Sequence, residues 1–429
     1  MASAFDDEKI RLKQALDELI ALNKISSAVN SLMAVKDITR VIIDNCLTRT
    51  QTSQGVVFLI EEEDKSVDKA KTFVREFSRD ASQIPFHLSQ SLTAWMTENR
   101  TLFMSNNPET DSRLKGLHLA DIGISSLLSA PLLSHTGLIG WLVLFNKKDA
   151  GGFTEGDKRF VGIVVSQTAK VIENARLREQ EEQFNIVKEE MKVARQIQEG
   201  FLPKKGLALP DCQICGHNLP ARDVGGDFFD IVELDGKRVF ISLGDVSGKG
   251  MPAALLMANA QAVLRSHLFR KGELKLKEMA GSLNDLIFQF SGPDRFITTI
   301  LGHYEYRSRV FRYVNAGHPP PFLFRSDGTI VEPSQADIVI GVIAGYAFTE
   351  AQIRLKAGDI LVIYSDGITE LFNENDEEFG EERLRNLIME VRYEAVEDIC
   401  GRIFNALKNF RGNRQQSDDI TFVVMKACD

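Results

Sequence analysis

Cysteine is scarce in this chain and supplies no framework of disulfide bonds. Only five cysteines occur in 429 residues, at positions 46, 212, 215, 400 and 428. Disulfide-stabilised secreted domains are short and much denser in cysteine. The opening segment, MASAFDDEKIRLK, also lacks a basic stretch followed by an apolar one, so no signal peptide is expected. Together these absences predict a cytoplasmic protein.

Positive charge is in deficit. The chain has 51 Lys and Arg against 60 Asp and Glu, which gives a formal net charge of −9. A chain this acidic gains nothing from attraction to a phosphate backbone, so we expect no nucleic-acid partner. The same sign of charge argues against binding to an anionic membrane surface.

One uncharged run is long enough to cross a membrane. Residues 122–146 contain no Asp, Glu, Lys or Arg, and about 20 apolar residues suffice for a transmembrane helix. However, Pro131, Gly137 and Gly140 interrupt the run. The pattern predicts two strands, ISSLLSAPLLS and LIGWLVLF, joined by a turn at His135-Thr136-Gly137.

A long helix is predicted from about Thr154 to Phe201, before Pro203. From Leu177 onward its apolar residues follow a heptad, which Gln180 and Gln198 interrupt. Such a heptad favours a parallel coiled coil, and the alternative is an amphipathic helix packed on its own domain. The heptad positions are Leu177, Phe184 and Met191 at one place, and Val187, Ala194 and Phe201 at the other.

The candidate catalytic and metal-binding residues are aspartates that lie directly beside predicted strands in the second half of the chain. They are Asp227 in VGGD, Asp245 in LGDVSGKG, Asp366 in YSDG, and Asp418 with Asp419 in SDDIT. Any one of these motifs alone would be read as a turn. Together they can meet in one cleft, where their mutual repulsion requires cations.

The donor set indicates which cations these would be. Hard oxygen ligands without His or Cys select Mg²⁺ or Mn²⁺ over zinc. Two such ions, bridged by a carboxylate and a water, generate a hydroxide-like nucleophile near neutral pH. That chemistry suits hydrolysis of a phosphate ester. Neighbouring glycines let the backbone approach the metals, so the Val246 carbonyl is a further candidate ligand.

Six motifs in this half occur in the order found in a known enzyme family. ARQIQEGFLP, PARDVGGDFFD, GDVSGKGMPAALLM, NAGHPPP, GDILVIYSDGITE and SDDITFVV span about 190–426. They resemble the SpoIIE/RsbU group of bacterial type 2C-like Ser/Thr phosphatases. The resemblance implies an α/β/β/α sandwich with two Mn²⁺ or Mg²⁺ ions between its sheets. It also implies the following roles: Asp227 and Asp245 catalytic, with Asp245 bridging the metals; Asp227, Asp245, Asp366 and Asp418 as metal ligands; Val246 as a carbonyl ligand; and Asp419 as a ligand or its neighbour.

Three further residues bear on this resemblance. Eukaryotic members have a histidine soon after the bridging aspartate, proposed as general acid, where this chain has Ser247. The acid must then be another group, such as a metal-bound water. His318 in NAGHPPP is interpreted as a structural loop residue. Arg222 is a candidate for binding substrate phosphate, with an ordinary surface arginine as the alternative.

Residues of about 20–175 resemble a GAF domain, a sensor of small ligands or proteins. The matching stretches are SLTAWMTENRTLFMSNNPETDSRL, SSLLSAPLLSHTGLIGWLVLFNKK and FTEGDKRFVGIVVSQTAKVIENARL. A fragment of the cyclic-nucleotide signature is present at Asn146-Lys147, Phe153 and Asp157. Its closing acid is replaced by Lys158, so the ligand of this domain stays open.

The expected organisation is α+β with two domains. An N-terminal helix over 1–20 precedes a GAF-like sensor over 21–175, whose antiparallel sheet has flanking helices. A coiled-coil linker helix over 176–203 leads to the phosphatase sandwich over 204–429.

The function implied is a signal-regulated, metal-dependent protein Ser/Thr phosphatase. By resemblance, its substrate is a phosphorylated antagonist of an anti-sigma factor in a partner-switching pathway. A homodimer through the GAF domain and linker helices is expected. One alternative is a catalytically silent scaffold that binds a phosphoprotein. Another is a nucleotide cyclase, suggested by GGDFF, although that family has an acid where Phe228 stands.

Overall fold

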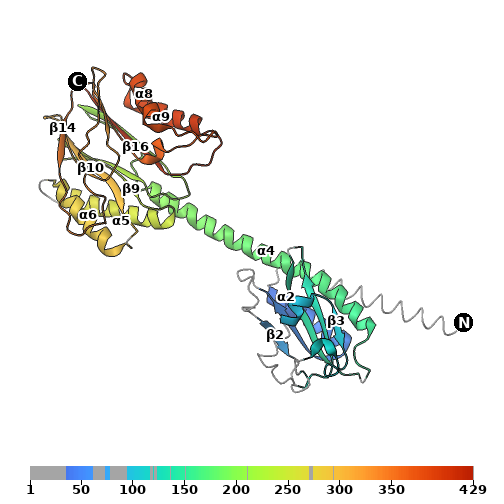
Figure 1. The fold of residues 1–429 in the computed structure, drawn as a ribbon. Helices are drawn as coiled ribbons and strands as arrows, with labels where there is room; N and C mark the ends of the chain where they lie inside the picture. The colour runs from blue at the N-terminus through green and yellow to red at the C-terminus, as the bar shows by residue number, and fades with distance from the viewer. Residues whose placement is uncertain are drawn as a thin grey trace. The chain divides into compact units, whose positions relative to one another are not determined.

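The computed structural model describes residues 35–60, 73–77, 94–115, 119, 123–135, 137–149, 151–209, 211–269, 274–292 and 294–428. The helix predicted over 1–20 lies outside these residues. The chain divides into two compact units, Met1–Ile186 and Val187–Asp429 (Figure 1).

The first unit is built on an antiparallel sheet in the order β2-β1-β5-β4-β3. A helix, α2 (Val35–Thr50), and the first part of α4 (Glu155–Glu199) supply apolar side chains to its core, and a short 3₁₀ turn covers Ser112–Leu114. The strands are β1 (Thr52–Leu59), β2 (Phe73–Phe77), β3 (Phe103–Ser105), β4 (Leu127–Leu133) and β5 (Leu138–Lys147).

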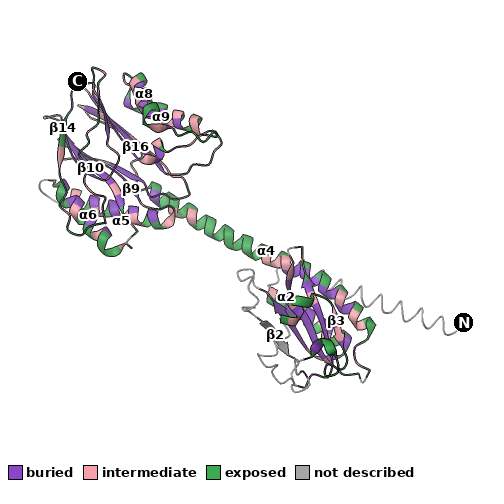
Figure 2. Ribbon diagram, in the orientation of Figure 1, coloured by how far each residue is buried: buried purple, intermediate pink, exposed green. Residues whose placement is uncertain are grey.

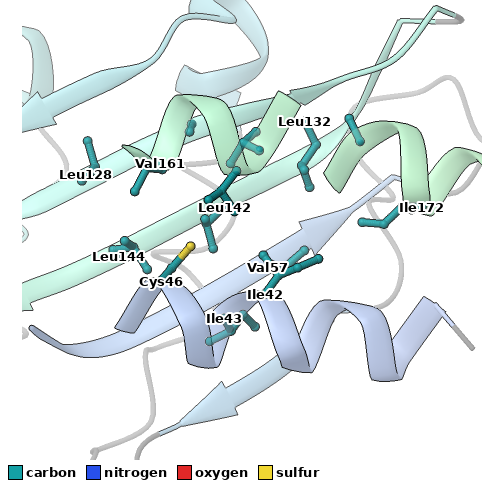
Figure 3. Close-up of a cluster of buried hydrophobic side chains, with 14 of the residues drawn as sticks. Ile42, Ile43, Cys46, Val57, Leu128, Leu132, Leu142, Leu144, Val161 and Ile172 are labelled. Atoms are coloured by element: carbon teal, nitrogen blue, oxygen red, sulfur yellow. The ribbon is translucent and has the colours of Figure 1, made fainter. Parts of the chain in front are cut away.

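The core of this unit forms because both helices present apolar residues at helical spacing. Ile42, Ile43 and Cys46 of α2 are buried with Val57 and with residues of β4, β5 and α4 (Figure 3). Strands β4 and β5 confirm the hairpin predicted from the uncharged run, and the Ser134 amide donates to the Gly137 carbonyl at 2.8 Å across the turn. Among the described residues, no helix is long and apolar enough to cross a membrane.

The fragment of the cyclic-nucleotide signature forms a structural cluster. Lys147 makes an ion pair with Asp157, and its ammonium lies 6.0 Å from the centre of the Phe153 ring. Asn146 adopts a positive φ of 57°, and its side chain bonds the backbone at Gly123 and Ser125. These contacts fix the turn from β5 into α4 and need no ligand.

Helix α4 follows the predicted bounds closely, beginning at Glu155 and ending at Glu199. Its first part packs on the sheet of the first unit, whereas its middle is exposed (Figure 2). Phe201, assigned to the heptad, lies beyond the end of the helix, so that assignment is wrong. The exposed apolar residues of α4 from Leu177 onward are Leu177, Phe184, Ile186, Val187, Val193 and Ile197.

The second unit confirms the predicted α/β/β/α sandwich. One sheet has the order β14-β11-β10-β9-β8 and the other β13-β12-β15-β16-β7-β6. The strands are β6 (Leu207–Ala208), β7 (Cys212–Leu219), β8 (Phe228–Leu234), β9 (Arg238–Val246), β10 (Ile297–Glu305), β11 (Val310–Ala316), β12 (Phe322–Phe324), β13 (Ile330–Val331), β14 (Ala351–Arg354), β15 (Ile360–Tyr364) and β16 (Ile420–Ala427).

Helices cover the two outer faces of the sandwich, as Figure 1 shows for α5 and α6 beside β9 and β10 and for α8 and α9 beside β16. A third apolar layer lies between the sheets and includes Ile241 of β9 and Ile363 of β15. The helices are α5 (Met251–Leu268), α6 (Leu276–Phe290), α7 (Asp366–Thr369), α8 (Gly380–Val391) and α9 (Val396–Arg411).

Candidate active site

All four acidic motifs lie at strand ends of the sandwich. Asp227 directly precedes β8, and Asp245 is the next-to-last residue of β9. Because β8 and β9 are antiparallel, with Phe228 opposite Gly244, the start of β8 lies beside the end of β9. Asp227 and Asp245 therefore lie at the same end of these two neighbouring strands.

The second sheet contributes the remaining acids in the same way. Asp366 begins α7 just after β15, and Asp418 and Asp419 directly precede β16. Tyr364 pairs with Phe422, and the Ser365 amide donates to the Thr421 carbonyl at 2.9 Å. The predicted convergence of the acidic motifs is therefore present in the fold.

The Asp-Gly of YSDG is required by close packing and not by a turn. A Cβ on Gly367 would lie 1.9 Å from the carbonyl oxygen of Asp419, which no side chain tolerates. Only glycine lets the segment after β15 approach the segment before β16. This contact keeps Asp366 close to Asp418.

Asp419 holds the loop that carries Asp227. Its carboxylate accepts hydrogen bonds from the amides of Ala221 at 2.7 Å, Gly226 at 2.7 Å and Asp227 at 3.3 Å. Both of its oxygens are thus committed to the backbone of the loop that joins β7, in the same sheet as β16, to β8 in the other sheet. This geometry makes Asp419 a positioning residue for the 220–227 loop.

Three of the other acids have raised pKa values because they are buried near further carboxylates. Burial, followed by the charges of Asp245 and Asp419, raises the pKa of Asp227 well above its usual value. Burial and then the charge of Asp366 raise the pKa of Asp245 to about 6. Burial and the charge of Asp418 raise the pKa of Asp366. Like charges in a partly dry site oppose ionisation, so bound divalent cations would favour the ionised form of these carboxylates.

The residues present fit hard divalent cations. Asp227 is 2% exposed, and its Oδ2 atom has no hydrogen-bond partner in the described part of the chain. A buried carboxylate oxygen without a donor is costly, and a metal ion would satisfy it. Within the described residues, no group of three or more His, Cys, Asp or Glu side chains is placed so that it could hold a metal ion as the chain stands.

One cation is supplied by the chain itself. The Lys249 ammonium lies 2.7 Å from Asp418 Oδ2 and donates to the Ser417 carbonyl at 2.6 Å. Sequence reasoning missed this role, since nothing in GDVSGKG indicates where the lysine points.

Two arginines also border the cluster. Arg295 donates to the Ser247 carbonyl at 3.0 Å. Arg222 is exposed, and a Cβ on Gly250 would lie 3.8 Å from its Nη1 atom. Arg222 thus reaches the start of α5, where no side chain caps the helix. This is the chemistry expected of a phosphate-binding position.

His318 is a structural residue in this fold. It is 3% exposed, and its Nδ1 atom lies 2.8 Å from Thr298 Oγ1. Burial lowers the pKa of His318 to about 3, so the ring is neutral at physiological pH. A neutral, enclosed imidazole is a poor general acid.

The last turn of α4 reaches the site directly. The Gln198 amide nitrogen donates to the Gly225 carbonyl at 2.7 Å, and the Gly225 amide donates back to Gln198 Oε1 at 3.1 Å. Arg265 of α5 anchors the same region through Asp230 and the Phe201 carbonyl. Gln198, one of the two glutamines that interrupt the heptad, therefore holds the loop that carries Asp227.

The comparisons with known proteins agree with this geometry. Residues 235–427 match the family model described as stage II sporulation protein E (SpoIIE), and residues 33–173 match that of the GAF domain. Phosphoserine phosphatase RsbU of Bacillus subtilis is 28% identical over 242 residues, which cover 56% of this chain and 70% of RsbU. Protein IcfG of Synechocystis sp. is 29% identical over 274 residues, which cover 57% of this chain and 43% of IcfG.

A solved structure supports the fold of the second unit. The SiaA-PP2C domain of Pseudomonas aeruginosa matches 57% of this chain and 98% of its own, with a TM-score of 0.50 and 18% identity. At that identity the likeness establishes the sandwich and nothing finer.

Asp245→Asn should stabilise the metal-free protein. Because the pKa of Asp245 is raised on folding to about 6, its ionised form destabilises the folded state at neutral pH. Removing the charge should raise the free energy of unfolding in EDTA by about 1–3 kcal/mol. The same change should abolish the stabilisation that Mn²⁺ gives the wild type, as measured by thermal melting.

Asp398→Asn, at an exposed position in the first turn of α9, is the control: it should not raise the melting temperature in EDTA and should keep the stabilisation by Mn²⁺. A melting temperature in EDTA that does not rise in Asp245→Asn, or a Mn²⁺ effect that survives, would contradict the assigned cluster.

Proposed function

Since the chain consists of a GAF domain followed by a SpoIIE-type phosphatase domain of the PP2C class, we propose that it is a metal-dependent protein Ser/Thr phosphatase regulated by a signal. The observation that carries this proposal is the meeting of Asp227, Asp245, Asp366 and Asp418 at one end of the sandwich. The family membership supports the enzyme class, and the clustered aspartates support a mechanism with two metal ions.

Two Mn²⁺ or Mg²⁺ ions would be held by these four aspartates and the Val246 carbonyl, with Asp245 between them. When bound, the ions would supply a water activated for attack on phosphorus. Asp419 keeps Asp227 in place through the 220–227 backbone. Arg222 and the uncapped start of α5 would receive the substrate's phosphate, and their positive potential would orient it toward the acids.

We infer that the substrate is a phosphoserine or phosphothreonine protein. The printed name of RsbU, phosphoserine phosphatase, supports this class. A phosphorylated antagonist of an anti-sigma factor, acting in partner switching, is the specific substrate we propose. The silent-scaffold alternative is disfavoured because every acidic motif keeps its carboxylate.

The wild type should hydrolyse p-nitrophenyl phosphate only with Mn²⁺ or Mg²⁺, and EDTA should stop the reaction reversibly. Asp227→Asn should lower kcat at least about 100-fold, because the loss of a ligand disrupts both metal affinity and position. Asp398→Asn is the control.

Turnover by Asp227→Asn equal to that of the wild type would refute the assigned site. Phosphoprotein binding without any metal-dependent turnover in the wild type would establish the scaffold function instead.

We propose that the chain is a homodimer through α4 and the GAF domain. Leu177, Phe184 and Val187 are 57%, 67% and 50% exposed. They keep heptad spacing, and exposed apolar residues in that pattern are typical of a two-stranded interface. Ile186, Val193 and Ile197 form a second exposed row, spaced by seven and four residues.

Phe184→Glu should weaken this dimer, since it places like charges across the interface. Light scattering of the intact chain should give a dimer mass for the wild type and a shift toward monomer for the variant. Phe290→Glu, which alters an equally exposed phenylalanine on α6 (76%), should leave the mass unchanged. A monomeric wild type would rule out the dimer.

Signal transmission is proposed to pass through Gln198. A change in the packing of α4 would act on the Gly225 backbone and so on Asp227, two residues later. This route needs no contact between the GAF domain and the catalytic cleft.

Gln198→Leu should therefore raise the Mn²⁺ concentration needed for half-maximal activity about tenfold or more, since it leaves the buried Gly225 amide and carbonyl without partners. Gln196→Leu, exposed on the same turn, is the control. Equal dependence of activity on Mn²⁺ concentration in the two variants would contradict the proposed role of Gln198 in holding the Asp227 loop.

A further inference from the structure

A pocket of about 450 Å³ opens beside the acidic cluster, on the side of the sandwich covered by α9. Its apolar lining includes Leu219 at the end of β7 and Phe404 and Leu407 of α9. Lys408, Arg411 and Arg414 complete the wall. None of the groups assigned above as metal ligands lines it, so the pocket is separate from the reacting centre.

The pocket and the acidic cluster nevertheless share backbone. Ala221, in the pocket wall, donates its amide to Asp419 at 2.7 Å. Gln416, also in the wall, donates from its Nε2 atom to the carbonyls of Leu219 at 2.8 Å and Asp418 at 2.7 Å. An extended peptide advances about 3.3 Å per residue. A chain with its phosphorylated residue at the acids can therefore reach the pocket within a few residues.

The charged side chains that line the pocket are all basic. Its lining holds three basic residues and no acidic one. Arg414 is paired with Asp376 at 2.5 Å. The Arg411 side chain donates a hydrogen bond to the neutral Gln416, and its Nε atom is buried without a partner in the described part of the chain. Neither Arg411 nor Lys408 forms an ion pair with a described residue. In a chain of net charge −9, two cations without an acidic partner beside an apolar lining would attract an anionic segment of another chain.

We propose that this pocket binds the substrate's own chain next to the phosphorylated residue, and that it selects a segment with an apolar side chain flanked by carboxylates. This inference rests on the proposed phosphatase function and deepens it. The apolar side chain would fill the space over Leu219 and Leu407, and the carboxylates would meet Lys408 and Arg411. The pocket thus sets substrate choice and takes no part in the chemical step.

The test uses two phosphoserine peptides with the intact chain and Mn²⁺. One carries Leu and Glu on both sides of the phosphoserine, and the other has Lys in place of Glu. The wild type should favour the acidic peptide about five- to tenfold in kcat/KM, through KM and not kcat. Lys408→Glu should abolish or reverse this preference, while hydrolysis of p-nitrophenyl phosphate stays unchanged.

Two controls make the result specific. Lys277→Glu makes the same charge change on exposed α6 and should keep the preference, and Lys408→Arg should restore it. Equal kcat/KM for the two peptides in the wild type, or a preference that survives Lys408→Glu, would overturn the inference. Failure of the phosphatase proposal itself has a different signature, namely no metal-dependent hydrolysis of p-nitrophenyl phosphate.

Discussion

Electrostatic repulsion among carboxylates at one end of the sandwich is the constraint on which the rest of the second unit depends. Asp227, Asp245 and Asp366 all have raised pKa values because each is partly or fully buried in the field of the others. Folding must hold these groups together against that repulsion. The backbone does so through Gly367, which permits two segments to touch, and through Asp419, which binds the opposite loop. Divalent cations would remove this repulsion when they bind.

The 220–227 loop connects the acidic cluster both to helix α4 and to the basic pocket. Gln198 at the end of α4 holds it on one side, and Ala221 links it to the basic pocket on the other. Both connections are hydrogen bonds to the backbone, so small movements of the loop are transmitted to Asp227. Regulation by the linker would thus act on Asp227 through this short segment, which also borders the pocket proposed to select the substrate.

Much of the site was predictable because its residues stand next to strands. The apolar periods of β9, β15 and β16 are clear, so the acids beside them had to lie at sheet edges. The sandwich was implied by the family resemblance of the six motifs, and the GAF hairpin was predicted from two apolar runs separated by a turn. Phe201 was wrongly assigned to the heptad because its spacing is right, yet α4 ends at Glu199 and the Phe201 carbonyl bonds Arg265.

Other features depend on tertiary contacts that a single sequence does not encode visibly. Lys249 forms an ion pair with Asp418, which lies 169 positions later in the chain. Gln198, in the last turn of α4, donates a hydrogen bond to Gly225 in the loop before β8. The interruption of the heptad at Gln198 was a usable signal, since a buried polar residue needs a partner. The basic pocket combines residues of β7, α9 and the segment before β16, so only the folded chain reveals it.

The most direct measurement of the central claim is diffraction from crystals of the chain grown with Mn²⁺, with the ions located by their anomalous scattering. We predict two Mn²⁺ ions between the sheets, within ligand distance of Asp227, Asp245, Asp366 and Asp418. Absence of bound ions there, or ions bound only elsewhere on the surface, would contradict the account.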